Sequence, residues 1–344
     1  MAVSGTILEG NYLKDIFEQP KVLEATLNEL HATPALDSLL VRLNQGEFKR
    51  VILTGMGASF LALYPLNIQL VSRGLTSFML DTSELLYYQS ELLRPDTLLV
   101  VNSQSGSSAE IAHLLELNKN KAPVIGVSNT AGSPLDSLAD AAILTRAGRE
   151  FSTSCKTYVT GLLALTWLGG LIQGHNPEQI KRKLDLAAPA VYAYLLNWKE
   201  YTLELCQQLK GVRNLYFAGR GASLAAAGMA GLVMKEAAHF QAEGMGSAAF
   251  RHGPLEICYP RPLWWFLPAI PKLPRQMAAW SQRSSGLAVR QSWSRVIRPV
   301  TSITCRPHRK KSARSWRFCR YRCSAWRWQL WPGVRRVCST EVGK

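Results

Sequence analysis

The chain contains one short pattern twice, and this duplication constrains its fold more than any other feature. An apolar run ends in Gly-x-Gly-Ala-Ser at residues 51–59 and again at residues 215–223, and an Ala- or Leu-rich stretch follows each copy. Each copy is typical of a buried parallel strand, a glycine turn and a helix whose first-turn amides can face an anion. The repeat therefore predicts two related α/β units built around phosphate-binding turns.

Apolar segments of strand length recur through the first half of the chain. They lie at residues 51–53, 77–80, 98–101, 124–127 and 141–144, and stretches suited to helices separate them. This alternation predicts a parallel, doubly wound sheet whose ligand lies at the carboxyl ends of the strands. The expected fold class is α/β, with two doubly wound, flavodoxin-like parallel-sheet domains of which the second is incomplete.

These patterns predict five segments along the chain. They are a helical N-terminal arm (1–48), a first α/β domain (49–175), a helical connector (176–210), the N-terminal part of a second α/β domain (211–260) and a basic tail (261–344). Beyond Pro260 the alternating apolar pattern stops, so no further strand is expected there.

The net charge of +16 is concentrated in the tail. Residues 1–260 carry a net charge of −2, whereas residues 261–344 carry +18. The body therefore does not have the charge of a nucleic-acid binder, and only the tail could bind nucleic acid non-specifically.

No signal peptide is visible, the longest apolar stretch (158–172) is too short to span a bilayer, and the cysteines are scattered like reduced thiols. A cytoplasmic protein is expected.

The tail has an unusual composition that allows three interpretations. It contains eight of the ten tryptophans and four of the seven cysteines. A shifted reading frame near residue 260 is the favoured interpretation, because the composition is unlike that of a globular core. A nucleic-acid-binding tail and a metal site at Cys305, His308, Cys319 and Cys323 are the alternatives. The arginine-rich surroundings disfavour the metal.

Polar side chains cluster in three loops of the first domain. They are Gly57 and Ser59 after the first strand, Ser103, Gln104, Ser105 and Ser108 after the third, and Thr153 and Ser154 after the fifth. Hydroxyls and free amides at a helix start can hold a phosphate without a metal. Plain helix capping is the alternative reading of these serines and threonines.

A dinucleotide site is a second alternative for the first glycine turn. Gly55-x-Gly57 follows a strand, and Asp81 ends the next strand, where a ribose-binding acid would lie. However, Phe60 occupies the place of the third glycine of that fingerprint. Because the fingerprint depends on all its parts, a dinucleotide is not the expected ligand.

The segment Ser103-Gln104-Ser105-Gly106, taken with residues 57–59 and 156–158, resembles the sugar isomerase (SIS) domain family. The likeness extends over about residues 11–258 and is greatest to the isomerase half of the glucosamine-6-phosphate synthases. It implies that Ser59, Ser103, Gln104, Ser105 and Ser108 hold the phosphate of a hexose or hexosamine 6-phosphate, and that backbone near Thr153 and Ser154 closes the site. The resemblance implies no cofactor and no metal.

In the second domain the resemblance assigns two catalytic residues. It implies that Glu236 moves a proton between C1 and C2 of the sugar and that His252 helps to open the ring, in the active site of a neighbouring subunit of a homodimer. A carboxylate and a group of near-neutral pKa suit these steps. The residues alone do not exclude Glu243 as the competing carboxylate.

The chain departs from the family pattern at several points. Val233 replaces a lysine of the amino-transfer branch, the loop at 150–158 is one residue shorter, and no glutamine-hydrolysing domain precedes residue 11. The expected function is therefore sugar-phosphate binding with isomerase or deaminase chemistry, impaired by the altered tail. The alternative is a sensor that binds a sugar phosphate without converting it.

Overall fold

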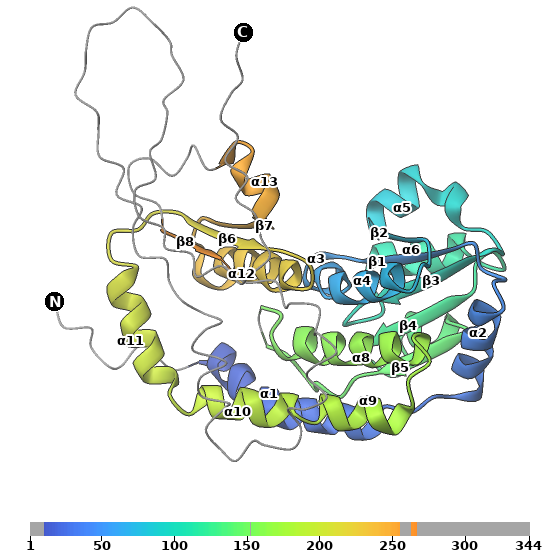
Figure 1. Ribbon diagram of the computed structural model, residues 1–344, viewed down its shortest axis with the longest axis horizontal. Helices are drawn as coiled ribbons and strands as arrows, with labels where there is room; N and C mark the ends of the chain where they lie inside the picture. Colours follow the sequence, from blue (N-terminus) through green and yellow to red (C-terminus); the bar gives the residue numbers. More distant parts are fainter. Residues whose placement is uncertain (1–9, 152, 255–262, 267–344) are drawn as a thin grey trace, which may run out of the picture. The chain divides into compact units, whose positions relative to one another are not determined.

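The computed structural model describes residues 10–151, 153–254 and 263–266, the last four through their backbone alone (Figure 1). All of them belong to one compact unit, Met1–Ile303. The rest of the basic tail, including the candidate metal ligands Cys305, His308, Cys319 and Cys323, lies outside the described residues.

Five parallel strands form the first sheet, in the order β2-β1-β3-β4-β5. They are β1 (Arg50–Gly55), β2 (Ser77–Asp81), β3 (Thr97–Asn102), β4 (Val124–Ser128) and β5 (Ala141–Leu144). All five strands predicted for this half are present, and the order is that of the flavodoxin-like doubly wound fold. The chain reverses its direction of travel across the sheet between β1 and β3, which places the switch point there.

Alternating side chains of the strands fill two separate cores. Val51 and Leu53 pack on one face of the sheet, and Ile52 between them packs on the other. The first face is covered by α1 (Asn11–Glu29), α2 (Pro34–Asn44), α4 (Tyr64–Ser72) and α8 (Lys156–Ile172), and the second by α5 (Thr82–Tyr88), α6 (Ala109–Leu117) and α7 (Pro134–Leu138) (Figure 1). Because both faces are covered, the three central strands β1, β3 and β4 are buried along almost their whole length and are largely apolar.

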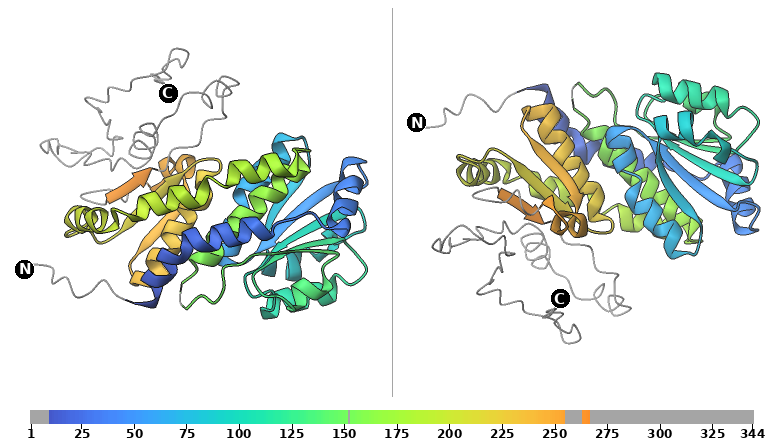
Figure 2. Two further views of the ribbon diagram at one scale, coloured as in Figure 1. Left: turned by 90° about the horizontal axis from the view of Figure 1, so that it is seen from below. Right: turned by 90° about the horizontal axis from the view of Figure 1, so that it is seen from above.

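Helix α1 attaches the N-terminal segment to the first domain. It packs along α8 and α10, as the two views of Figure 2 show. Leu23 and Leu27 of α1 enter the core of the first face. Three helices connect the halves of the chain: α9 (Pro177–Leu184), α10 (Ala187–Leu195) and α11 (Trp198–Gln208). The short helices α3 (Gly57–Leu61) and η1 (Ser90–Leu92) complete the first half.

The second copy of the repeated pattern forms a smaller parallel sheet. Its described strands, in the order β7-β6-β8, are β6 (Leu215–Gly219), β7 (Ala242–Gly246) and β8 (Leu263–Phe266). The helices are α12 (Ser223–Ala238) and α13 (Ser247–Arg251). The two glycine turns match in conformation, because Gly57 and Gly221 have φ of 51° and 55°.

Strand β8 corrects one expectation from the sequence. It follows Pro260, where no strand was predicted, and it pairs in parallel with β6. Its apolar run lies outside the regular alternation of strands and helices that identified the strands of the first sheet, and only its pairing with β6 reveals it.

Candidate functional site

The three polar loops meet because parallel strands end at one edge of a sheet. In the register of the first sheet, Gly55 of β1 pairs with Asp81 of β2, and Asn102 of β3 pairs with Val127 of β4. Ser128 of β4 in turn pairs with Leu144 of β5. The polar loops after β1, β3 and β5, together with the loop after β4, therefore open on the same side, beside the switch point. A doubly wound sheet binds its ligands at this place.

The loop after β3 is held rigidly by its own hydroxyls and by its neighbour. Ser103 Oγ accepts a hydrogen bond from the amide of Gly106 at 3.2 Å, and Ser105 Oγ accepts one from Ser107 at 3.3 Å. The carbonyl of Gln104 accepts a bond from the amide of Asn129 at 3.0 Å. The peptide chain of the loop is thus fixed against the loop that follows β4.

Gly106 has no room for a side chain. Its φ is 60°, and a Cβ at this position would lie 2.2 Å from Ser133 Oγ and 2.9 Å from Ser128 Oγ. Only glycine combines this left-handed backbone with so close an approach. The loop therefore turns tightly into α6, whose first residues Ala109 and Glu110 follow the N-cap Ser108.

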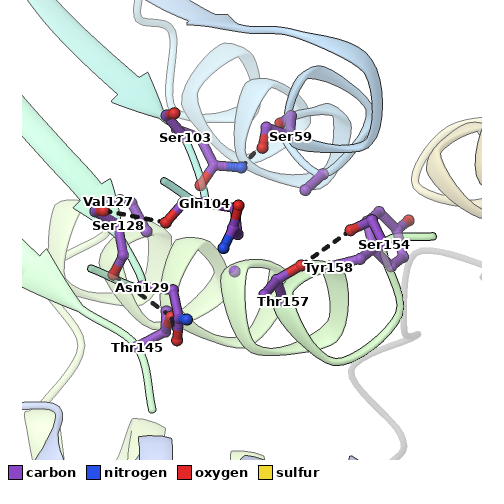
Figure 3. Close-up of a pocket in the computed structure, with 13 residues that line it drawn as sticks. Ser59, Ser103, Gln104, Val127, Ser128, Asn129, Thr145, Ser154, Thr157 and Tyr158 are labelled. Atoms are coloured by element: carbon purple, nitrogen blue, oxygen red, sulfur yellow. Dashed lines mark hydrogen bonds between the residues drawn. The ribbon is translucent and has the colours of Figure 1, made fainter. Parts of the chain in front are cut away.

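A pocket of about 290 Å³ opens among these loops (Figure 3). Its walls are Ser59, Ala62, Asn102, Ser103, Gln104, Val127, Ser128, Asn129, Thr145, Ser154, Thr157, Tyr158 and Gly161. Hydroxyl and amide groups dominate this wall, and none of these residues carries a charge. A wall of this composition suits a small polar ligand.

Four of the eight residues predicted to bind the phosphate line the pocket. They are Ser59, Ser103, Gln104 and Ser154. The other four lie beside it: Gly57 makes the turn before α3, Ser105 bonds to the amide of Ser107, Ser108 caps α6 by accepting from Ile111, and Thr153 is buried in the loop before α8.

Five polar residues of the wall were not chosen from the sequence: Asn102, Ser128, Asn129, Thr145 and Thr157. Asn102 Nδ2 donates to the carbonyl of Ser59 at 2.8 Å and so ties β3 to α3. Asn129 Oδ1 accepts from the Ala147 amide at 2.8 Å. A usable signal exists for Ser128, Asn129 and Thr145, because these polar residues directly follow the apolar runs of β4 and β5, as others do after β3.

The loop before α8 forms the third wall. The Glu150 carboxylate accepts bonds from the amides of Cys155 at 2.7 Å and Thr157 at 3.2 Å, and also from the Thr157 hydroxyl. The hydroxyls of Ser154 and Thr157 lie 3.0 Å apart in the pocket wall (Figure 3). Burial raises the pKa of Tyr158 well above its usual range, so its phenol is a neutral group at physiological pH.

Glu236, one of the two predicted catalytic residues, does not line the pocket but stands on the helix beside its wall. Helix α12 packs on α3, where Leu232 approaches Gly57. Glu236 lies one turn further along α12 and is exposed. Burial raises the pKa of Tyr12 to about 12, and the charges of Cys155, Glu150, Glu236 and Asp15 add to this rise.

His252 and Glu243 occupy other places in the second half. His252 directly follows α13 and is exposed, and it is not part of the pocket wall. Glu243 is on β7, where its carboxylate pairs with Lys235 at 3.3 Å on the surface. The competing carboxylate thus has a partner on α12.

Asp81 serves as the N-cap of α5. Its Oδ1 accepts bonds from the amide of Ser83 at 3.0 Å and from the Ser83 hydroxyl at 2.6 Å. A cap of this kind gives this aspartate a structural role without a dinucleotide.

Within residues 10–151, 153–254 and 263–266, no three His, Cys, Asp or Glu side chains gather in a way that could hold a metal ion. Across the same part of the chain, no helix is both long and apolar enough to cross a membrane.

Comparison with known proteins places this geometry in a family. Residues 47–169 match the SIS domain. The chain is 31% identical over 252 residues to glutamine–fructose-6-phosphate aminotransferase [isomerizing] of Pyrococcus horikoshii, a match that covers 71% of this chain and 41% of the relative. The chain thus spans about two-fifths of the length of the curated relatives that it matches.

Solved structures share the fold. The C-terminal domain of glucosamine-fructose-6-phosphate aminotransferase from Francisella tularensis has a TM-score of 0.64 at 22% identity, over 78% of this chain and 77% of that chain. Tagatose-6-phosphate ketose/aldose isomerase from Escherichia coli has a TM-score of 0.63 at 20% identity, over 76% and 74%. Residues 47–169 of the chain therefore form a SIS domain.

Proposed function

We propose that the pocket binds a hexose or hexosamine 6-phosphate, with the phosphate at the start of α6. The observation that carries this proposal is the loop 103–108, which presents a cluster of hydroxyls at a helix N-terminus on the switch-point edge of the sheet. The named relatives, an aminotransferase and an isomerase acting on sugar phosphates, support the ligand class.

The uncharged wall is compatible with a dianionic ester. Helix N-termini and oriented hydroxyls stabilise an anion without a lysine or arginine at the site. Because these donors are fixed by hydrogen bonds to one another, little reorganisation is needed on binding. We therefore expect the affinity for the phosphate to depend only weakly on salt, unlike binding through exposed cations.

Catalysis is the second part of the proposal. Glu236 would move the proton between C1 and C2, and His252 would assist ring opening in the site of the partner subunit. Glu236 is on α12, which packs on α3, the helix that contributes Ser59 to the pocket wall, and this placement supports its role. The same proposal includes three further expectations. The protein is a cytoplasmic homodimer, each chain has two domains at residues 49–175 and 211–260, and the phosphate is also bound by Gly57, Ser105, Ser108 and Thr153.

Binding without conversion is the second candidate function. It is favoured by one observation: no carboxylate or imidazole is among the residues that line the pocket. A protein of this kind would sense the sugar phosphate and regulate a partner. Turnover, not binding, separates the two functions.

Binding is tested with the full chain by isothermal titration with fructose 6-phosphate and glucosamine 6-phosphate. Saturable binding of either ester is expected, while fructose, which lacks the phosphate, should bind at least about tenfold more weakly. Equal binding of fructose and its phosphate ester would contradict the assignment of the loop to the phosphate.

Turnover is tested by comparing two carboxylate variants. Glu236→Gln should abolish interconversion of the hexose phosphates while leaving their binding intact, because the amide keeps the shape but cannot take the proton. Glu243→Gln is the matched control and should retain turnover. If the unaltered chain binds the ester and never converts it, the sensor function is the correct one.

A further inference from the structure

Lys156 is a buried lysine that the pocket does not use. Its side chain is 2% exposed, and it is paired with Asp15, whose side chain is 1% exposed. Neither residue lines the pocket. Two charges buried in this way cost desolvation free energy, and well-packed apolar residues often stabilise a core as well. The pair therefore needs a reason beyond the attachment of α1.

The contacts of the pair form a closed ring around the loop before α8. The Lys156 ammonium lies 2.9 Å from Asp15 Oδ1 and 2.6 Å from Glu18 Oε2, and it donates to the carbonyl of Arg149 at 2.8 Å. The other oxygen of Asp15 accepts the amide of Phe151 at 3.1 Å. The peptide groups on both sides of Glu150 are thus held by one ion pair.

Glu150 carries this constraint into the pocket. Its carboxylate, placed by the ring, accepts the amides of Cys155 and Thr157 and the Thr157 hydroxyl. The Thr157 hydroxyl in turn contacts that of Ser154, and both line the pocket. On the other side of the loop, Gln19 of α1 donates to the Cys155 sulfur at 2.8 Å.

We propose that Lys156 and Asp15 are positioning residues that set the geometry of the third pocket wall through Glu150, and thereby the affinity for the ligand. The effect on ligand affinity rests on the proposed function. Burial alone would lower the pKa of Lys156, but the bonds to Glu18 and Asp15 outweigh burial and raise it. The ammonium therefore stays charged, and the ring stays closed, at physiological pH. Helix α1 thus belongs to the binding site without touching the ligand.

Attachment of α1 alone does not require this ring. Leu23 and Leu27 already bury α1 in the core of the first face. A pair that only fastened the helix would not need to bond peptide groups on both sides of one glutamate. The specific bonds to Arg149 and Phe151 therefore point to control of the loop.

The first test needs no ligand. Amide hydrogen exchange is measured in the full chain for Cys155 and Thr157, whose amides bond to Glu150. In Lys156→Met these amides should exchange at least about tenfold faster, whereas amides of β3 keep their protection. Leu23→Ala is the control, because it weakens the packing of α1 and should leave the two amides protected. Unchanged protection in Lys156→Met would overturn the proposal.

A second variant covers the case that Lys156→Met does not fold, since it leaves the Asp15 charge buried and unpaired. Asp15→Asn with Lys156→Gln removes both charges together, and the same loss of protection at Cys155 and Thr157 is expected. Retained protection in this double variant would contradict the proposal equally.

The third readout is coupling in ligand binding. Lys156→Met and Thr157→Val should each weaken fructose 6-phosphate binding by about tenfold, and the combined variant should lose little more, because both act through one wall. Additive losses would overturn the positioning role. If the unaltered chain does not bind the ester at all, the proposed function fails, whereas the exchange measurement still decides the inference about the ring.

Discussion

Gly106 shows how one residue determines the candidate site. Its left-handed backbone turns the loop 103–108 into α6, and its missing side chain leaves room for Ser133 and Ser128. The Ser-Gln-Ser-Gly sequence could be interpreted before the structure because glycine and clustered hydroxyls have few other uses directly after a buried strand. Asn129 and Thr145 could not be chosen in the same way, since their place in the wall depends on how β4 and β5 align with β3.

Replacement of Gly106 by alanine should lower the free energy of unfolding by about 3 kcal/mol, the sum of left-handed strain and overpacking. Gly132→Ala is the matched control: φ is 70° there, but nothing lies within 4 Å of a new Cβ. It should cost about 1 kcal/mol of strain alone. Urea denaturation measures both, and equal losses would show that the contacts with Ser133 and Ser128 do not matter.

Helix α6 provides the N-terminus on which the proposed phosphate site depends. Its N-cap, Ser108, accepts the amide of Ile111 at 3.4 Å, so capping and ligand binding compete as explanations of this serine. Sequence patterns could predict the strands around this site because apolar runs and helix-forming stretches alternate regularly through the first half of the chain. They missed β8, since this alternation does not continue beyond Pro260.

The variant Ser108→Asp separates capping from ligand binding. Aspartate caps helices as well as serine, so the free energy of unfolding should change by less than about 0.5 kcal/mol. The new charge should nevertheless weaken fructose 6-phosphate binding by more than about tenfold, because it repels a phosphate at the same helix end. Ser108→Ala is the control with the opposite pattern. It should lower the free energy of unfolding by about 1 kcal/mol and change the affinity less than Ser108→Asp does. Binding by Ser108→Asp equal to that of the unaltered chain would remove the phosphate from this helix.

At the scale of the whole molecule, α1 packs against the loop before α8. Burial raises the pKa of Tyr12 to about 12 and that of the Cys155 thiol to about 11. The sequence suggested a role for Glu236 through family resemblance, but it could not show that α1 holds this loop. That arrangement depends on contacts such as the one between Gln19 and Cys155, which are 136 residues apart, and no local pattern encodes it.

These two groups predict a loss of stability at alkaline pH. Below pH 9 both are neutral in the folded and the unfolded chain, so their contribution is complete. The unfolded chain releases the thiol proton near pH 9 and the phenol proton near pH 10, whereas the folded chain holds them until about pH 11 and 12, so the free energy of unfolding falls between pH 9 and 12. In urea denaturation, Tyr12→Phe should make the free energy of unfolding fall less steeply above pH 10. Tyr88→Phe is the control, because it removes an exposed phenol and should leave the slope unchanged. A fall of equal slope in Tyr12→Phe would contradict the burial of Tyr12.

The central claim is that the loop 103–108 holds the phosphate of a sugar ester, and a crystal of the full chain soaked with fructose 6-phosphate tests it most directly. The account predicts phosphate oxygens within hydrogen-bond distance of the hydroxyls and amides between Ser103 and Ser108, with the sugar in the pocket beside Thr157. A phosphate bound elsewhere while this pocket stays empty, or a nicotinamide dinucleotide that occupies it in a parallel soak, would contradict the account.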